Sequence, residues 1–127
     1  MSTSSPIRFA VIGTGMIARF HAQAVQASEG AKLAAAFGRN PKTLKEFGES
    51  FGIKTHASLE SLLADPEIDA VTIATPTGDH ASVAIPAAKA GKHIFCEKPL
   101  EVTPEKTDAI IRAASENKVL LAPIFQS

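Results

Sequence analysis

The chain has 127 residues, of which 45% are hydrophobic and 20% are charged, and its acidic and basic residues balance to a net charge of zero. This composition predicts one globular domain and excludes a largely disordered chain. Because there is no basic block and no apolar run near the ~20 residues of a membrane helix, we expect neither nucleic-acid nor membrane binding. A single cysteine, Cys96, excludes an internal disulfide and, with the polar start of the chain, favours a cytoplasmic location.

After a flexible start over residues 1–6, segments typical of strands and helices alternate along the chain. Strands are expected at 7–12, 32–37, 53–55, 70–74, 93–96 and 119–122. Helices are expected at 15–28, 41–51, after Ser58, at 79–90 and at 104–117. This alternation predicts an α/β doubly wound parallel sheet of about six strands, a Rossmann fold. In such a fold, ligands bind at the carboxyl ends of the strands.

A glycine-rich turn directly follows the first expected strand. Gly13 would allow a sharp turn, Gly15 would let a ligand approach the backbone closely, and the small Ala18 would let the helix pack on the strand. The helix would begin at about Gly15, and its free N–H groups suit the pyrophosphate of a dinucleotide, with Met16 and Ile17 as expected cofactor-binding residues. Similar glycine patterns occur in ordinary turns, so this motif needs support from the rest of the chain.

The end of the second expected strand bears on which dinucleotide is bound. Gly38 stands about 20 residues past the glycine motif, where NAD-binding domains place a carboxylate for the ribose 2′-hydroxyl. Glycine leaves room there, and the neighbouring Arg39 could pair with a 2′-phosphate, with Lys42 adding a second positive charge. The alternative is that Arg39 is a solvated loop residue. The absence of the acid favours NADP over NAD.

Two further loops follow the fourth and fifth expected strands. The first, Thr75-Pro76-Thr77-Gly78-Asp79-His80, leads into a helix, and the second is Glu97-Lys98-Pro99. A charged pair directly after a buried strand is costly unless it faces a polar cavity or a ligand. The alternative is an ordinary surface Lys–Glu pair.

Together with Gly13-Thr14-Gly15 and Gly38-Arg39-Asn40, these loops resemble the glucose-fructose oxidoreductase, inositol dehydrogenase and rhizopine-catabolism (Gfo/Idh/MocA) family. Glu97-Lys98-Pro99 is the most specific part of the resemblance, which runs from Ile7 to about Phe125. It implies an NAD(P)-binding domain over 7–122 and a second, larger α/β domain that carries substrate residues. We expect residues 123–127 to begin the crossing to that domain, which this chain does not include.

The resemblance also implies roles for individual residues. Thr75 and Pro76 would pass beside the nicotinamide and its ribose, while His80 would either support the cofactor or hydrogen-bond its own loop. Lys98 would act near the nicotinamide C4, where burial and the oxidised ring would lower its pKa and let it polarise the substrate or relay a proton. The expected cofactor-binding residues are Gly13, Gly15, Met16, Ile17, Gly38, Arg39, Thr75, Pro76, His80, Glu97 and Lys98. No metal is expected.

These observations predict the NAD(P)-binding domain of an oxidoreductase that moves hydride between a nicotinamide cofactor, preferably NADP, and a sugar, polyol or related alcohol or carbonyl. The resemblance places proton-handling Asp and His residues, and any surface for a homo-oligomer, in the second domain. We therefore expect cofactor binding by this chain without efficient turnover. The main alternative is a dinucleotide sensor or scaffold without chemistry. Glu97-Lys98-Pro99 disfavours a Rossmann methyltransferase.

Overall fold

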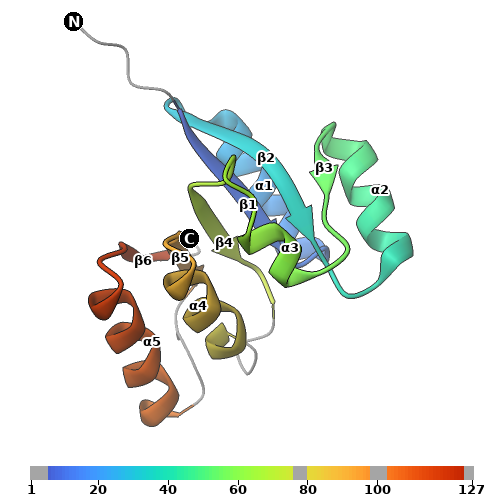
Figure 1. Cartoon of the computed structure of the whole chain (residues 1–127). Helices are drawn as coiled ribbons and strands as arrows, with labels where there is room; N and C mark the ends of the chain where they lie inside the picture. The colour runs from blue at the N-terminus through green and yellow to red at the C-terminus, as the bar shows by residue number, and fades with distance from the viewer. Residues whose placement is uncertain (1–5, 76–79, 98–102, 125–127) are drawn as a thin grey trace, which may run out of the picture.

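The computed structural model describes residues 6–75, 80–97 and 103–124, and in these residues six parallel strands form one sheet (Figure 1). The strand order is β3-β2-β1-β4-β5-β6. The strands are β1 (Ile7–Ile12), β2 (Ala31–Phe37), β3 (Lys54–Thr55), β4 (Ala70–Ile73), β5 (His93–Glu97) and β6 (Leu121–Ile124). The order reverses between β1 and β4, which confirms the predicted doubly wound sheet and marks where such folds bind ligands.

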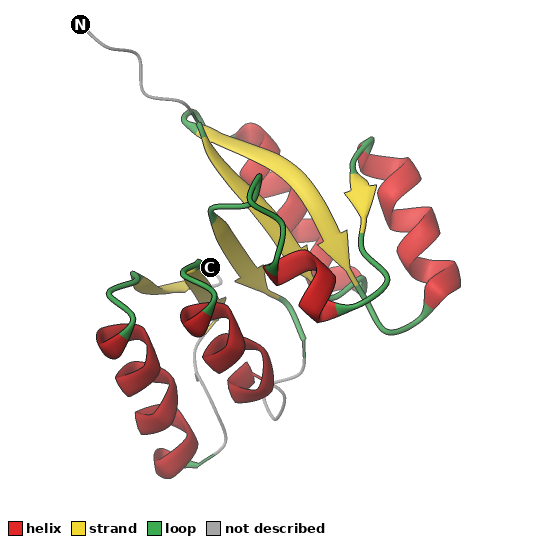
Figure 2. Cartoon of the chain, viewed as in Figure 1, coloured by secondary structure: helices red, strands yellow, loops and turns green. Residues whose placement is uncertain are grey.

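Helices cover both faces of the sheet (Figure 2). They are α1 (Met16–Ala27), α2 (Pro41–Phe51), α3 (Leu59–Leu63), α4 (His80–Lys89) and α5 (Pro104–Glu116). The buried side chains of α1 and α2 share one core cluster with Phe9 and Val11 of β1, whereas those of α3, α4 and α5 share the other with Ala10 and Ile12. The alternation along β1 follows from the two-residue period of a strand. None of the described helices is long and apolar enough to cross a membrane.

Local sequence signals explain where α2 begins and ends. The Asn40 Oδ1 atom accepts hydrogen bonds from the backbone N–H groups of Lys42 and Thr43, at 2.9 and 3.2 Å, and Pro41 takes the first helical position. This is the capping arrangement expected from the sequence. At the other end, Gly52 adopts the left-handed conformation, with φ 65°, and stops the helix. Asn40 thereby fixes the loop that connects β2 to α2.

The sixth strand differs from the sequence prediction. It begins at Leu121 and ends at Ile124, two residues later at each end than the expected strand at 119–122. Pro123 pairs in register with Cys96 of β5. Proline has no N–H to donate, and it is accommodated because β6 is the outer strand of the described sheet.

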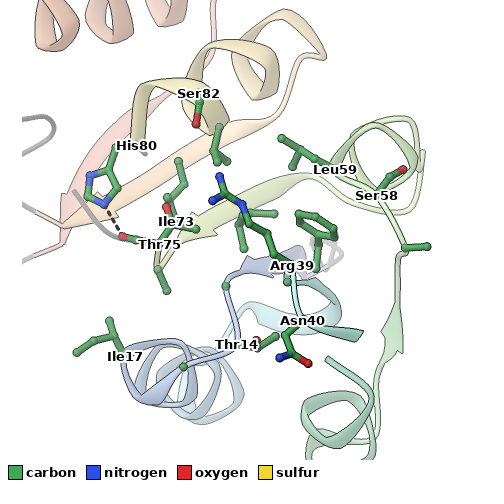
Figure 3. Close-up of a pocket in the computed structure, with 18 of the residues that line it drawn as sticks. Thr14, Ile17, Arg39, Asn40, Ser58, Leu59, Ile73, Thr75, His80 and Ser82 are labelled. Carbon is green, nitrogen blue, oxygen red and sulfur yellow. Dashed lines mark hydrogen bonds between the residues drawn. The ribbon is translucent and has the colours of Figure 1, made fainter. Parts of the chain in front are cut away.

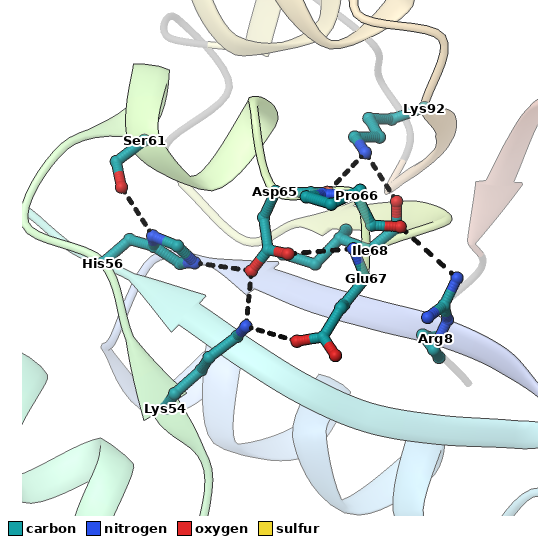
Figure 4. A network of polar contacts seen from close by, with 9 residues as sticks. All are labelled: Arg8, Lys54, His56, Ser61, Asp65, Pro66, Glu67, Ile68 and Lys92. Carbon is teal, nitrogen blue, oxygen red and sulfur yellow. Dashed lines mark hydrogen bonds and ion pairs between the residues drawn. The ribbon is translucent and has the colours of Figure 1, made fainter.

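A polar network links β3 and the residues that follow it to the turn before β4 (Figure 4). The Asp65 carboxylate accepts from Lys54 Nζ at 2.6 Å and contacts His56 Nε2 at 3.0 Å. The Lys54 hydrogen bond, with the backbone N–H of Glu67, lowers the pKa of Asp65 to about 2. The buried Lys92 donates through Nζ to the carbonyls of Asp65 and Ile68, at 2.8 and 2.6 Å. This network fixes the α3–β4 turn.

Candidate functional site

A pocket of about 1110 Å³ opens at the carboxyl ends of β1, β2 and β4 (Figure 3). It collects most of the residues that the sequence singled out: Gly13, Gly15, Met16, Ile17, Gly38, Arg39, Thr75 and His80. Glu97 ends β5. Pro76 and Lys98 lie outside the described residues. Among the described residues, the pocket lining therefore unites three of the loops that the sequence placed at this edge.

Gly13 makes the turn after β1 possible. Its φ is 115°, in the region that favours glycine, and its N–H donates to the Phe37 carbonyl at 2.7 Å. A Cβ at this position would lie 2.9 Å from the Ala74 carbonyl oxygen. The turn therefore packs directly against the backbone that follows β4, and no larger residue fits.

Gly15, in contrast to Gly13, leaves open space at the start of α1. It is the N-cap residue of α1, with φ −82° and ψ −166°, and no side chain caps this helix end. A Cβ at Gly15 would meet no atom within 4 Å. The first N–H groups of a helix have no partners within the helix and carry its positive end. Open space at this end of α1 fits a phosphate-bearing ligand.

Gly38 does not leave the room that the sequence suggested. A Cβ there would lie 2.6 Å from Thr14 Cγ2 and 2.7 Å from Thr14 Oγ1. The Thr14 side chain, from the turn after β1, already fills the space beside Gly38. Thr14 Oγ1 lies 3.1 Å from the hydroxyl of Thr43 in α2. Thr14 thus links two of the loops that line the pocket.

Arg39 is the cationic group of the described pocket lining. Its side chain is exposed, and it extends from the end of β2 across the pocket, toward the side that carries Ile73 and Ser82 (Figure 3). The carboxamide oxygen of its neighbour Asn40 caps α2 instead. Because the Arg39 guanidinium is a cation in the pocket lining, it suits an anionic group of a ligand.

Thr75 and His80 form the β4–α4 side of the pocket. The Nε2 atom of His80 is 2.9 Å from the Thr75 carbonyl oxygen, and Nδ1 is 3.1 Å from the Cys96 sulfur (Figure 3). His80 thus lines the pocket and hydrogen-bonds its own loop, and its support of a cofactor stays a prediction. The Thr75 hydroxyl is buried and has no hydrogen-bond partner among the described residues. A buried hydroxyl of this kind fits a polar ligand group.

Sequence reasoning missed another wall of the pocket. Residues 57–60, between β3 and the first turn of α3, line it together with Ser82 and Val83 of α4. The rule that ligands gather at the carboxyl ends of strands could have indicated residues 57–60. The signal was weak because β3 has only two residues and shows little periodicity.

Comparison with known proteins agrees with this geometry. A family model described as an oxidoreductase family with an NAD-binding Rossmann fold (GFO_IDH_MocA) matches residues 7–125. Inositol 2-dehydrogenase of Rhizobium meliloti (strain 1021) is 35% identical over 115 residues, which cover 91% of this chain and 34% of that protein. UDP-N-acetylglucosamine 3-dehydrogenase of Acidithiobacillus ferrooxidans is 40% identical over 116 residues, which cover 91% of this chain and 36% of that protein.

Similarity extends to solved structures. Biliverdin reductase from Synechocystis sp. PCC 6803, in complex with biliverdin and NADP+, superposes with a TM-score of 0.86 at 32% identity, covering 94% of this chain and 38% of that protein. The chain spans about a third of the length of the curated relatives it matches. Since the family model matches residues 7–125, and the described fold and glycine turn agree with it, the chain belongs to the Gfo/Idh/MocA oxidoreductase family and comprises its NAD-binding Rossmann fold.

Proposed function

We propose that this chain binds NADP in preference to NAD, as the cofactor-binding part of an oxidoreductase that acts on a sugar, a polyol or a related alcohol or carbonyl. The observation that carries the proposal is the open space at Gly15, where the positive end of α1 faces the pocket. A dinucleotide pyrophosphate suits this position because it accepts hydrogen bonds from free N–H groups of the helix.

Other pocket residues would hold the remainder of the dinucleotide. The buried Thr75 hydroxyl, which has no partner among the described residues, would hydrogen-bond the nicotinamide end. His80 fixes the Thr75 carbonyl by its 2.9 Å hydrogen bond. Met16 and Ile17 would contact the cofactor from the first turn of α1. By the family resemblance, we also propose Pro76 and Glu97 as cofactor-binding residues.

The preference for NADP rests on the end of β2. Gly38 offers no carboxylate to a ribose 2′-hydroxyl, and the Arg39 guanidinium would supply a planar set of donors to a 2′-phosphate. An arginine–phosphate pair is a charge-assisted interaction, stronger than a hydrogen bond between neutral groups.

A bound nicotinamide supplies hydride transfer, and the chain must then orient the substrate and move one proton. We assign the proton step to Lys98, which directly follows β5. The two relatives named above are dehydrogenases of inositol and of a nucleotide sugar, and their names support a substrate with a ring hydroxyl. Because the chain spans about a third of their length, the activity, substrate and any self-association of the whole protein belong to the proposal.

A titration with NADPH and with NADH tests the proposal. The chain has no Trp and no Tyr, so nicotinamide fluorescence can be followed with little protein background. We expect tighter binding of NADPH, and we expect Arg39→Ala to weaken NADPH binding by about tenfold, or ~1.4 kcal/mol, with little effect on NADH. Arg112→Ala, on the exposed side of α5, serves as the matched control and should change neither.

Two results of this titration would count against the proposed function. Tighter binding of NADH would overturn the role of Arg39 while leaving the dinucleotide site in place. If a chain shown to be folded by circular dichroism bound neither dinucleotide, the cofactor function would fail.

A further inference from the structure

The hydrogen bonds around Thr14 have a fixed direction. The Thr43 hydroxyl donates to the Asn40 carbonyl oxygen at 3.1 Å, and a carbonyl oxygen can only accept. A hydroxyl has one proton, so Thr43 cannot also donate to Thr14. In the 3.1 Å contact between the two hydroxyls, Thr14 is therefore the donor. This bond holds the Thr14 side chain between the turn after β1 and the start of α2.

Held in this position, Thr14 blocks any side chain at Gly38. Three Thr14 atoms, Cγ2, Oγ1 and Cβ, would lie 2.6, 2.7 and 3.2 Å from a Cβ added to Gly38. The backbone itself does not require glycine, because Gly38 is not among the glycines with positive φ. The obstacle to a larger residue at Gly38 is thus the Thr14 side chain.

From this contact we infer that Thr14 is a specificity-determining residue of the cofactor site. The end of β2 is where a carboxylate would select NAD through the ribose 2′-hydroxyl. With Thr14 in place, no such carboxylate can be accommodated at position 38, and Arg39 remains the cationic group of the described pocket lining. Thr14 and Gly38 act as a matched pair that keeps the site selective for a 2′-phosphorylated dinucleotide. This inference rests on the proposed function.

A stability test examines the pairing without any ligand. Gly38→Ala should lower the melting temperature in the native background, and it should do so much less when combined with Thr14→Ala, which removes the two nearest atoms. Thr14→Val is the matched control, because valine keeps two γ atoms and loses only the hydroxyl. Gly38→Ala should remain as harmful beside Thr14→Val as beside threonine. Equal effects of Gly38→Ala in all three backgrounds would overturn the pairing.

A binding test examines specificity with NADPH and NADH as the probes. Gly38→Asp alone should bind both weakly or fail to fold, whereas Thr14→Ala/Gly38→Asp should fold and prefer NADH, with the ratio of dissociation constants reversed by about tenfold or more. Thr14→Val/Gly38→Asp should not show this rescue. The inference fails if Gly38→Asp alone folds and prefers NADH, because no change at Thr14 is then needed. It also fails if the Thr14→Ala/Gly38→Asp variant is folded and still prefers NADPH.

Failure of the proposed function and failure of the specificity inference give different results. If the proposed function is wrong, the native chain binds neither dinucleotide or binds NADH more tightly than NADPH, although the coupling between Thr14 and Gly38 still appears in the melting temperatures. If only the specificity inference is wrong, the native chain binds NADPH and the variants show one of the contrary results above.

Discussion

Cys96 of β5 and His80 at the start of α4 lie with Sγ 3.1 Å from Nδ1. The other ring nitrogen of His80, Nε2, is 2.9 Å from the Thr75 carbonyl oxygen, which can only accept. Nε2 therefore carries a proton, and in the neutral ring Nδ1 accepts from the Cys96 thiol. The Thr75 carbonyl thus fixes the tautomer of a histidine that lines the pocket, and the Cys96 thiol supplies the proton that the other ring nitrogen accepts.

This relationship predicts different results for two substitutions of Cys96. Cys96→Ser keeps a donor for Nδ1, whereas Cys96→Ala leaves a buried acceptor without one, a loss of about 1–3 kcal/mol of stability. Denaturant unfolding of both variants measures the difference. Nitrogen-15 shifts of the His80 ring should show Nε2–H in the native chain and in Cys96→Ser. Equal stability of the Ser and Ala variants would refute the hydrogen bond.

For Gly48 in α2, we predict that substitution by alanine destabilises the chain, contrary to ordinary helix propensity. In an exposed helix interior, Gly→Ala stabilises by about 1 kcal/mol. Here a Cβ would lie 2.6 Å from Thr55 Cγ2 and 3.2 Å from the Ile53 carbonyl oxygen. We therefore expect Gly48→Ala to lower the melting temperature, and Thr55→Ser, which removes Cγ2, to restore part of it.

Ser50→Ala, on the exposed side of the same helix, is the control for Gly48→Ala and should be neutral or slightly stabilising. If Gly48→Ala raised the melting temperature as much as Ser50→Ala, the close approach of β3 to α2 would be wrong.

The lowered pKa of Asp65 predicts that the folded chain loses stability in acid. Its pKa is about 2 in the folded chain, against an ordinary 3.8, because Lys54 and the N–H of Glu67 hydrogen-bond the charged carboxylate. A carboxylate whose pKa is lower in the folded chain than in the unfolded chain stabilises the fold at pH values above the unfolded pKa. That stability is lost as the pH falls from about 3.8 through about 2. Urea unfolding between pH 6 and pH 2 should therefore show a decline that Asp65→Asn reduces.

Asp69, whose pKa is lowered mainly by its hydrogen bond to Arg8, contributes to the same decline, so that Asp65→Asn should remove only part of it. Glu116→Gln, on the exposed end of α5, is the control and should leave the pH profile unchanged. A profile for Asp65→Asn that matches the native one would show that the carboxylate has no such role.

The sequence predicted the sheet and most of the pocket, because both depend on local patterns. The apolar runs, the turn at Gly13 and the cap at Asn40 each act over a few residues. Contacts between distant segments could not be predicted in this way. The pairing of Thr14 with Gly38 and that of His80 with Cys96 exist only once the strands lie side by side. For that reason, Gly38 was read as leaving room that Thr14 in fact fills.

The central claim is that the open space at Gly15 receives the pyrophosphate of a nicotinamide dinucleotide. Gly15→Asp tests it most directly. Asp is a favoured N-cap residue, and the added Cβ meets no atom within 4 Å, so the fold should tolerate it. The neutral Gly15→Asn adds similar bulk and separates the effect of charge from that of size.

The measurement is the dissociation constant of NADPH for the native chain and for both variants, with the melting temperature of each chain without ligand. We predict native-like or higher melting temperatures, binding weakened by about tenfold or more in Gly15→Asn, and a further loss in Gly15→Asp from repulsion of the phosphates. Unchanged NADPH affinity in a folded Gly15→Asp chain would contradict the account, because the dinucleotide would then bind elsewhere.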